Sequence, residues 1–207
     1  MNIFLKAFCI SLLLLPLNLL VANSAFATPQ NFRTWCLAEN PQIQGAIIGQ
    51  ILRVMTGDED AGVDSKTCNS AHQAILKQTA LDLSPVTLIG NRYNDLPTEE
   101  RVIIDLQPLA SLTHLRELNL NDQLLIHDLK PLASLTKLQI LSLANNKITD
   151  IKPLNKLKQL RKLDLINNQI TDLSPLKNLP KLQEVQLSGN PLSSHNCPLR
   201  IRSICKF

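Results

Sequence analysis

A block of sequence that recurs every 22 residues constrains this chain more than any other feature. Leu138, Leu160 and Leu182 each begin a copy of the pattern L-x-x-[LV]-x-L-x-x-N. A fourth copy begins at Leu115 and has Gln123 where the other copies have asparagine. Self-similarity at a fixed period of this length indicates a fold made of stacked, equivalent units. The asparagines that close the three complete copies are Asn146, Asn168 and Asn190.

Apolar and polar residues alternate within each copy. This alternation predicts a short strand that buries its leucines and exposes the side chains between them. One such unit cannot bury its apolar face alone, so about three or more copies must stack to form a core. The motif and its period are those of leucine-rich repeats. We therefore predict an α/β fold, a leucine-rich-repeat solenoid with a short parallel sheet on its concave face.

The polar residues at fixed places in the repeat are predicted to be structural. A carboxamide turned inward can donate to and accept from backbone groups where the strand ends, so the three repeat asparagines are assigned to the bend. An aspartate opens the next segment and is followed by proline three residues later, which favours a turn or a short helical start over a long helix. These aspartates are Asp128, Asp150 and Asp172.

The repeats resemble the bacterial leucine-rich repeats of internalin type, which follow the pattern N-x-I-x-D-[IL]-x-P-L-x-x-L-x-x-L. That pattern stands here from Asn146 to Leu160 and again from Asn168 to Leu182, and the resemblance extends over residues 105–192. It implies a curved solenoid whose sheet lines a concave surface for a partner, usually a protein. It implies no catalytic residues.

The N-terminus has the composition of a signal peptide, with Lys6, an apolar run and the ending Ser-Ala-Phe-Ala at Ala27. The run is shorter than the about 20 apolar residues that span a bilayer. Cleavage after Ala27 is therefore preferred over an uncleaved anchor, and Cys9 would leave with the peptide. We predict a protein exported to the periplasm or outside the cell, with no stable membrane insertion after cleavage.

The rest of the chain divides into a helical N-terminal cap (28–80), the repeats (81–192) and a C-terminal cap (193–207). Apolar residues at helical spacing predict helices over 41–55 and 67–78. An irregular insertion lies near 84–104. Two registers fit this stretch: an additional repeat built on Leu83, Val86 and Leu88, or a cap strand at 81–83 followed by a surface excursion. For the apolar turn at 124–126, a repacked core is preferred over a contact patch.

Four cysteines remain after removal of the signal peptide, and an exported chain favours disulfides. They lie in two pairs at opposite ends of the solenoid, which favours Cys36–Cys68 and Cys197–Cys205. The arrangement is similar to that of secreted leucine-rich-repeat proteins of cyanobacteria, and the resemblance supports this pairing. Metal binding is not predicted. For zinc, the sequence has no C-x-x-C motif, and His195 with Cys197 is one ligand pair without a second. For calcium, Asp58, Asp60 and Asp64 do not have the spacing of a calcium-binding loop.

Composition argues against several functions. The formal net charge of +4 becomes +3 without the signal peptide, and aromatic residues are few, which does not favour nucleic-acid binding. The four histidines belong to no catalytic motif. We therefore predict a non-catalytic, monomeric protein with no cofactor.

Exposed positions of the predicted sheet are assigned to partner binding. They are Glu117, Asn119, Ile140, Ser142, Lys162, Asp164, Ile166, Glu184 and Gln186. The alternative is an envelope scaffold or an anionic polysaccharide-binding protein that uses a lysine-rich convex side. Its residues are Lys130, Lys137, Lys152, Lys156, Lys158, Lys177 and Lys181. Arg92, Tyr93 and Arg101 of the insertion are a third set of contact candidates, because loops that leave a regular scaffold are often functional.

Overall fold

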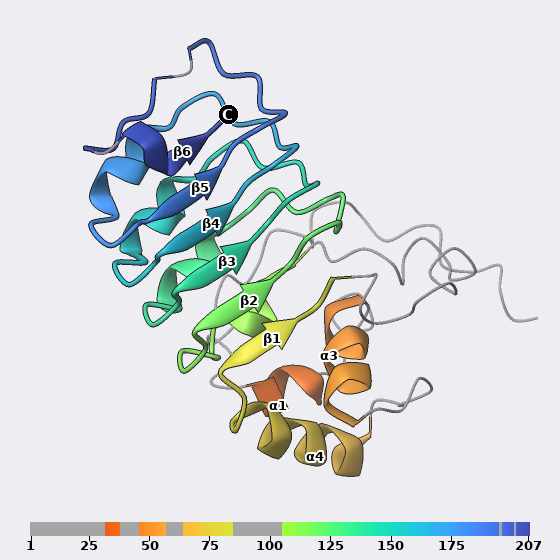
Figure 1. Cartoon of the computed structure of the whole chain (residues 1–207). Helices are drawn as coiled ribbons and strands as arrows, with labels where there is room; N and C mark the ends of the chain where they lie inside the picture. Colours follow the sequence, from red (N-terminus) through yellow and green to blue (C-terminus); the bar gives the residue numbers. More distant parts are fainter. Residues whose placement is uncertain (1–31, 38–45, 57–63, 85–104, 195, 201) are drawn as a thin grey trace, which may run out of the picture.

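A computed structural model describes residues 32–37, 46–56, 64–84, 105–194, 196–200 and 202–207. Three helices, α1 (Phe32–Cys36), α3 (Ala46–Thr56) and α4 (Ser65–Ile75), pack at one end of an open parallel sheet whose strands follow chain order (Figure 1). The strands are β1 (Ala80–Asp82), β2 (Glu117–Asn119), β3 (Ile140–Ser142), β4 (Lys162–Asp164), β5 (Glu184–Gln186) and β6 (Cys205–Lys206). The chain has the predicted leucine-rich-repeat fold.

Strand register places equivalent repeat positions side by side. The central apolar residues of β1 to β5 form one buried column, and each is at most 2% exposed. Adjacent strands lie about 4.8 Å apart, so this column forms a continuous core along the solenoid. The paired residues are Leu81, Leu118, Leu141, Leu163 and Val185.

Short 3₁₀ helices form the side of the repeats opposite the sheet. The second residue of each is a proline, which lacks an N–H that the first turn of a helix does not need and which fixes φ. The preceding aspartate accepts a hydrogen bond from the backbone N–H two residues later, as in Asp150 to Lys152 at 2.8 Å. The prediction of aspartate turn caps is confirmed. These helices are η3 (Gln107–Leu109), η4 (Lys130–Ser134), η5 (Lys152–Lys156) and η6 (Ser174–Asn178).

The repeat asparagines turn inward, as predicted. Asn168 is 5% exposed and its Nδ2 donates to the carbonyls of Leu143 and Leu165 at 2.9 and 3.1 Å. Its Oδ1 accepts from the Ile148 N–H at 3.1 Å. Because each carboxamide contacts the backbone of two neighbouring repeats, the asparagines fix the spacing of the stack.

The N-terminal helices are joined by the Cys36–Cys68 disulfide. Helix α4 begins at the cap Asp64, whose Oδ1 accepts from the Thr67 N–H at 2.7 Å; this bond lowers the pKa of Asp64. Asp58 and Asp60 lie outside the described residues. Nε2 of His114 lies 2.9 Å from the Ile75 carbonyl oxygen, so this side chain links the first repeat to α4.

Strand β1 lies at the start of the stretch 81–104, whose register was left open. Leu81 pairs with Leu118, 37 positions later, and Leu83 is fully buried. The cap strand predicted at 81–83 therefore corresponds to β1 at Ala80–Asp82, which lies beside β2. Residues 85–104, which would form the additional repeat or the surface excursion, lie outside the described residues.

The turn after β2 is more exposed than expected. Ile126 is buried, but Leu124 and Leu125 are 51% and 37% exposed, so the preference for a repacked core is wrong for these two residues. This repeat has one residue more than its neighbours. The additional residue is Leu124, which has a left-handed φ of 62°.

At the other end, the Cys197–Cys205 disulfide includes the first residue of a strand that the sequence pattern did not indicate. Helix η7 (Arg202–Ile204) leads into β6, whose Lys206 carbonyl accepts from the Leu187 N–H at 2.7 Å. The bridge thus holds the last strand against β5. Within the described ranges, no helix has the length and apolarity to cross a membrane.

Candidate functional site

The predicted partner-binding residues form two columns on the sheet. Glu117, Ile140, Lys162 and Glu184 align at the first position of the strands, and Asn119, Ser142, Asp164 and Gln186 align at the third. With neighbouring strands about 4.8 Å apart, four repeats present about 15 Å of side chains in register. Ile166, the ninth residue, lies two positions beyond the end of β4.

Two of the nine side chains are used to fix the ends of their own strands. Asn119 Oδ1 accepts from the Asn121 N–H at 3.1 Å, and Asp164 Oδ1 accepts from the Ile166 N–H at 3.0 Å. Side-chain bonds of this kind replace the ladder bonds that the strand loses where it turns. Asn119 and Asp164 therefore contribute rigidity to the face, while their remaining oxygen lone pairs can accept from a partner.

The charged residues of the first column are partly paired. Lys162 Nζ lies 3.7 Å from Glu184 Oε2, and both side chains are largely exposed. An exposed pair of this kind contributes less than about 1 kcal/mol. Gln186 Nε2 donates to Glu184 Oε1 at 3.0 Å, so Glu184 is held by two neighbours. In the described part of the chain, no hydrogen bond or ion pair engages the side chains of Glu117 and Ser142.

The apolar part of the face is small. Ile140 and Ile166 are half-buried, and Ala144, two residues beyond the end of β3, is 6% exposed. Covering the remaining apolar area would contribute about 25 cal/mol for each Å² that a partner removes from water. This face combines two aliphatic side chains with both signs of charge, which fits a protein surface better than a small apolar ligand.

A row of residues with left-handed backbone borders the two columns of this face. Asn145 Nδ2 donates to Asp122 Oδ1, and Asn167 Nδ2 donates to Asn145 Oδ1, both at 2.7 Å. Asp122, Asn145, Asn167 and Gly189 all have φ between 53° and 76°. Asp, Asn and Gly tolerate this conformation best, and they recur one position before Gln123 and before each repeat asparagine.

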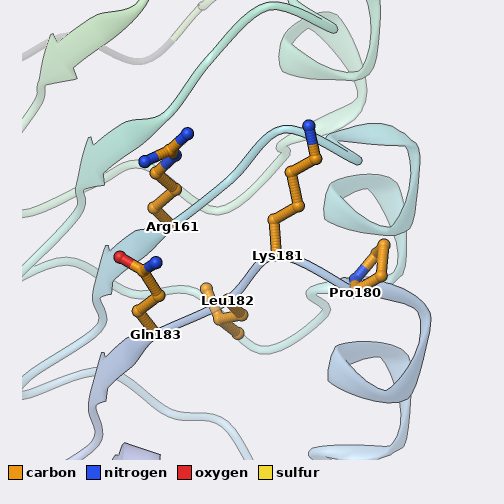
Figure 2. A pocket seen from close by; sticks show the side chains of 5 residues that line it. All are labelled: Arg161, Pro180, Lys181, Leu182 and Gln183. Atoms are coloured by element: carbon orange, nitrogen blue, oxygen red, sulfur yellow. The ribbon is translucent and has the colours of Figure 1, made fainter.

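Two arginines were also missed. Arg116 and Arg161 immediately precede β2 and β4, and both are exposed. Figure 2 shows Arg161 beside Gln183 and Lys181, where the chain passes from a 3₁₀ helix into a strand. Together with Pro180 and Leu182 they line an open depression on the edge of the solenoid. Arg92, Tyr93 and Arg101 lie outside the described residues.

Side chains that could hold a metal do not gather in the described ranges, where no group of three or more His, Cys, Asp or Glu is found. His195 lies outside them. Cys197 is bonded to Cys205.

Comparison with known proteins supports the fold. Residues 136–177 and 158–196 match the family model described as leucine rich repeats in two copies. Leucine-rich repeats are generally protein-interaction modules. No curated protein matches the chain.

Several solved bacterial structures are similar. Internalin C2 of Listeria monocytogenes has 24% identity over 89% of this chain and 99% of that chain, with a TM-score of 0.46. A second internalin of that organism has 22% identity over 80% and 56%, with a TM-score of 0.45. A leucine-rich repeat protein of Leptospira interrogans has 29% identity over 51% and 28%, with a TM-score of 0.41.

Proposed function

We propose that this protein is an exported, non-catalytic module that binds a protein through the concave face of its sheet. The observation that carries the proposal is the in-register pair of columns on β2 to β5, which includes the half-buried Ile140 and has the half-buried Ile166 beside it. The family model supports the general role, because leucine-rich repeats usually bind proteins.

The physical basis of binding is a surface arranged before the partner arrives. Asx turns and the asparagine row hold the ends of β2 and β4, so little conformational entropy is lost on association. Trp, Tyr and Arg, which usually dominate interface energies, are absent from both columns. We therefore expect modest affinity, with the two isoleucines as the main contacts.

The proposal is tested by chemical cross-linking of the oxidised protein to envelope proteins of its host, followed by purification of the captured protein and measurement of its Kd. The test variant is Ile140→Asp with Ile166→Asp, which places two charges on the concave face. We expect this variant to bind the purified partner at least about tenfold more weakly, which corresponds to 1.4 kcal/mol.

A matched control carries the same chemistry away from the sheet. Leu76→Asp with Leu124→Asp also replaces two aliphatic residues, which are 50% and 51% exposed and lie outside the columns. The control should bind like the unmodified protein. If the control loses affinity while the concave variant keeps it, the concave face is not the binding surface.

Export is part of the same proposal. Two disulfides indicate an oxidising compartment, and residues 1–27, outside the described residues, have the sequence of a signal peptide. Mass spectrometry of the protein from its host should find Thr28 at the N-terminus. Size-exclusion chromatography should give the mass of a single chain. An intact Met1 would contradict cleavage.

A second candidate, binding of an anionic polymer, is favoured by one specific observation, the distribution of charge around the solenoid. We also propose that this chain is related to secreted leucine-rich-repeat proteins of cyanobacteria.

A further inference from the structure

Acidic residues are confined to one part of each repeat. The segments that lead into strands β2 to β5, residues 106–116, 129–139, 151–161 and 173–183, contain no Asp or Glu. The strands and the turns that follow them hold all the acidic residues between 106 and 194. These are Glu117, Asp122, Asp128, Asp150, Asp164, Asp172 and Glu184.

The acid-free segments carry a line of exposed cations where the chain turns from each 3₁₀ helix into a strand. Figure 1 shows these turns following one another along one side of the sheet. Each of the four acid-free segments contributes at least one cation close to the start of its strand, and the segment before β4 contributes two. We define the basic edge as Arg116, Lys137, Lys158, Arg161 and Lys181, which are all exposed.

Neutral acceptors hold two of these ammonium groups in place. Lys158 Nζ donates to the Asn178 carbonyl oxygen at 2.7 Å, and Lys181 Nζ donates to Gln159 Oε1 at 2.6 Å. An ammonium has three donors, so each lysine keeps its full charge and two further donors. The ion pairs found among the described residues, Lys130–Asp128 and Lys162–Glu184, do not involve the basic edge.

Spacing along the edge indicates the shape of the ligand. Each repeat advances by about 4.8 Å at the sheet, so the cations form a row rather than a cluster around one point. A single phosphate or carboxylate would contact one or two of them, whereas a linear chain with an anion in most units could contact all. We propose that the basic edge binds a linear, carboxylate-bearing polysaccharide.

A polysaccharide fits this edge better than a nucleic acid. Single-stranded nucleic acid is held by aromatic side chains on which bases stack, and the four acid-free segments contain no Phe, Tyr or Trp. Three of the five cations on the edge are lysines. A lysine ammonium is a compact point charge and lacks the planar fork with which arginine matches a phosphate. The inference is independent of the proposed protein binding, because the basic edge and the concave columns share no residue.

Polygalacturonate is the probe for the test, with the full-length chain produced in an oxidising host. Its Kd is measured at about 50 mM and about 200 mM salt, and uncharged dextran serves as the polymer control. The test variant is K137S/R161S/K181S. We expect binding of polygalacturonate but not dextran, a weaker Kd at the higher salt, and a loss of about tenfold or more in the variant.

The matched control is K130S/K147S/K152S, which removes the same net charge next to the aspartates. It should bind within about twofold of the unmodified protein, and circular dichroism melting should show that both variants fold. Equal losses in the two variants would mean that net charge, not the basic edge, drives binding. No polygalacturonate binding at the lower salt, or tighter binding of double-stranded DNA at equal charge concentration, would also overturn the proposal.

Discussion

The repeats that end at Asn168 and Asn190 follow regular turns, whereas the repeat that ends at Asn146 follows the irregular turn after β2. The two regions differ in how completely the repeat asparagine is hydrogen bonded. Asn168 and Asn190 each accept from an isoleucine N–H in the preceding repeat, at 3.1 Å in both cases. Asn146 donates to Leu120 and Leu143 in the same way, but its buried Oδ1 has no hydrogen-bond partner among the residues that the structure describes. The residue that should supply the N–H is Ile126.

The extra residue Leu124 explains this difference. It separates Gln123 from Ile126 by one position more than in the other repeats, and it is half-exposed in a conformation that leucine rarely adopts. Gln123 still fulfils the donor role, because its Nε2 donates to the Leu83 carbonyl at 2.6 Å. The comparison shows that the solenoid tolerates a changed side chain at the asparagine position more easily than a changed length.

The largest expected effect separates two asparagines of equal burial. Asn168→Ala leaves the buried Ile148 N–H without its acceptor and removes one of the two side-chain donors to each of the Leu143 and Leu165 carbonyls, so it should lower the free energy of unfolding by about 3 kcal/mol. Asn146→Ala should cost about 1 kcal/mol less, since its Oδ1 is already unpaired. Urea denaturation measures both values. Equal losses would refute the claim that the ladder is interrupted at Asn146.

Gly189 should come next in magnitude. Its φ is +76°, and a Cβ there would lie 2.1 Å from Asn167 Oδ1. Gly189→Ala should therefore destabilise the protein by about 2 kcal/mol. Asn145→Gly, at the equivalent position, is the comparison: it relieves left-handed strain but loses the bonds of the asparagine row. A melting curve for Gly189→Ala that matches the unmodified protein would contradict the steric argument.

Deletion of Leu124 sharpens the comparison further, because it should restore the 22-residue period. The deletion removes a strained residue and brings the Ile126 N–H toward Asn146 Oδ1, so we expect stabilisation by about 1 kcal/mol. Deletion of Lys147, one repeat later, should instead destabilise the chain, since it breaks a regular turn. The length argument fails if both deletions change the unfolding free energy in the same direction.

The smallest effect concerns pH. Hydrogen bonds from the Ser174 N–H and hydroxyl hold the pKa of Asp172 below its usual value. A carboxylate whose pKa is lower in the folded state stabilises the fold above its unfolded pKa, and this contribution is lost as pH falls below about 4. Ser174→Ala should flatten the acid limb of a thermal-stability profile slightly. A steeper acid limb would have the wrong sign for this explanation.

The sequence predicted most of what the period controls. Recurring residues predicted the strands of the repeats, the inward asparagines and the aspartate caps. The positions of the cysteines at the two ends of the solenoid predicted both disulfides. Strand β6 could not be found, because Cys205–Lys206 is too short to show alternation and is held by the bridge and by β5. The contact between His114 and the Ile75 carbonyl could not be predicted, because Ile75 belongs to an element remote in sequence.

The candidate site was predicted in its positions but not in its interactions. Register fixed which residues share the sheet face, yet the Asx turns of Asn119 and Asp164 depend on local backbone geometry that a pattern does not specify. The basic edge was partly obscured in the sequence, since Lys130 and Lys152 belong beside the aspartates while Arg116 and Arg161 belong with the other cations.

The measurement that most directly tests the concave face is site-specific photocross-linking to the captured protein. Benzoylphenylalanine replaces Ser142 at the centre of the columns in one preparation and Leu125 at the irregular turn in another. Adducts to the partner should form from position 142 and be absent or minor from position 125. Adducts only from position 125 would move the binding surface to the irregular turn and contradict the role assigned to the regular repeats.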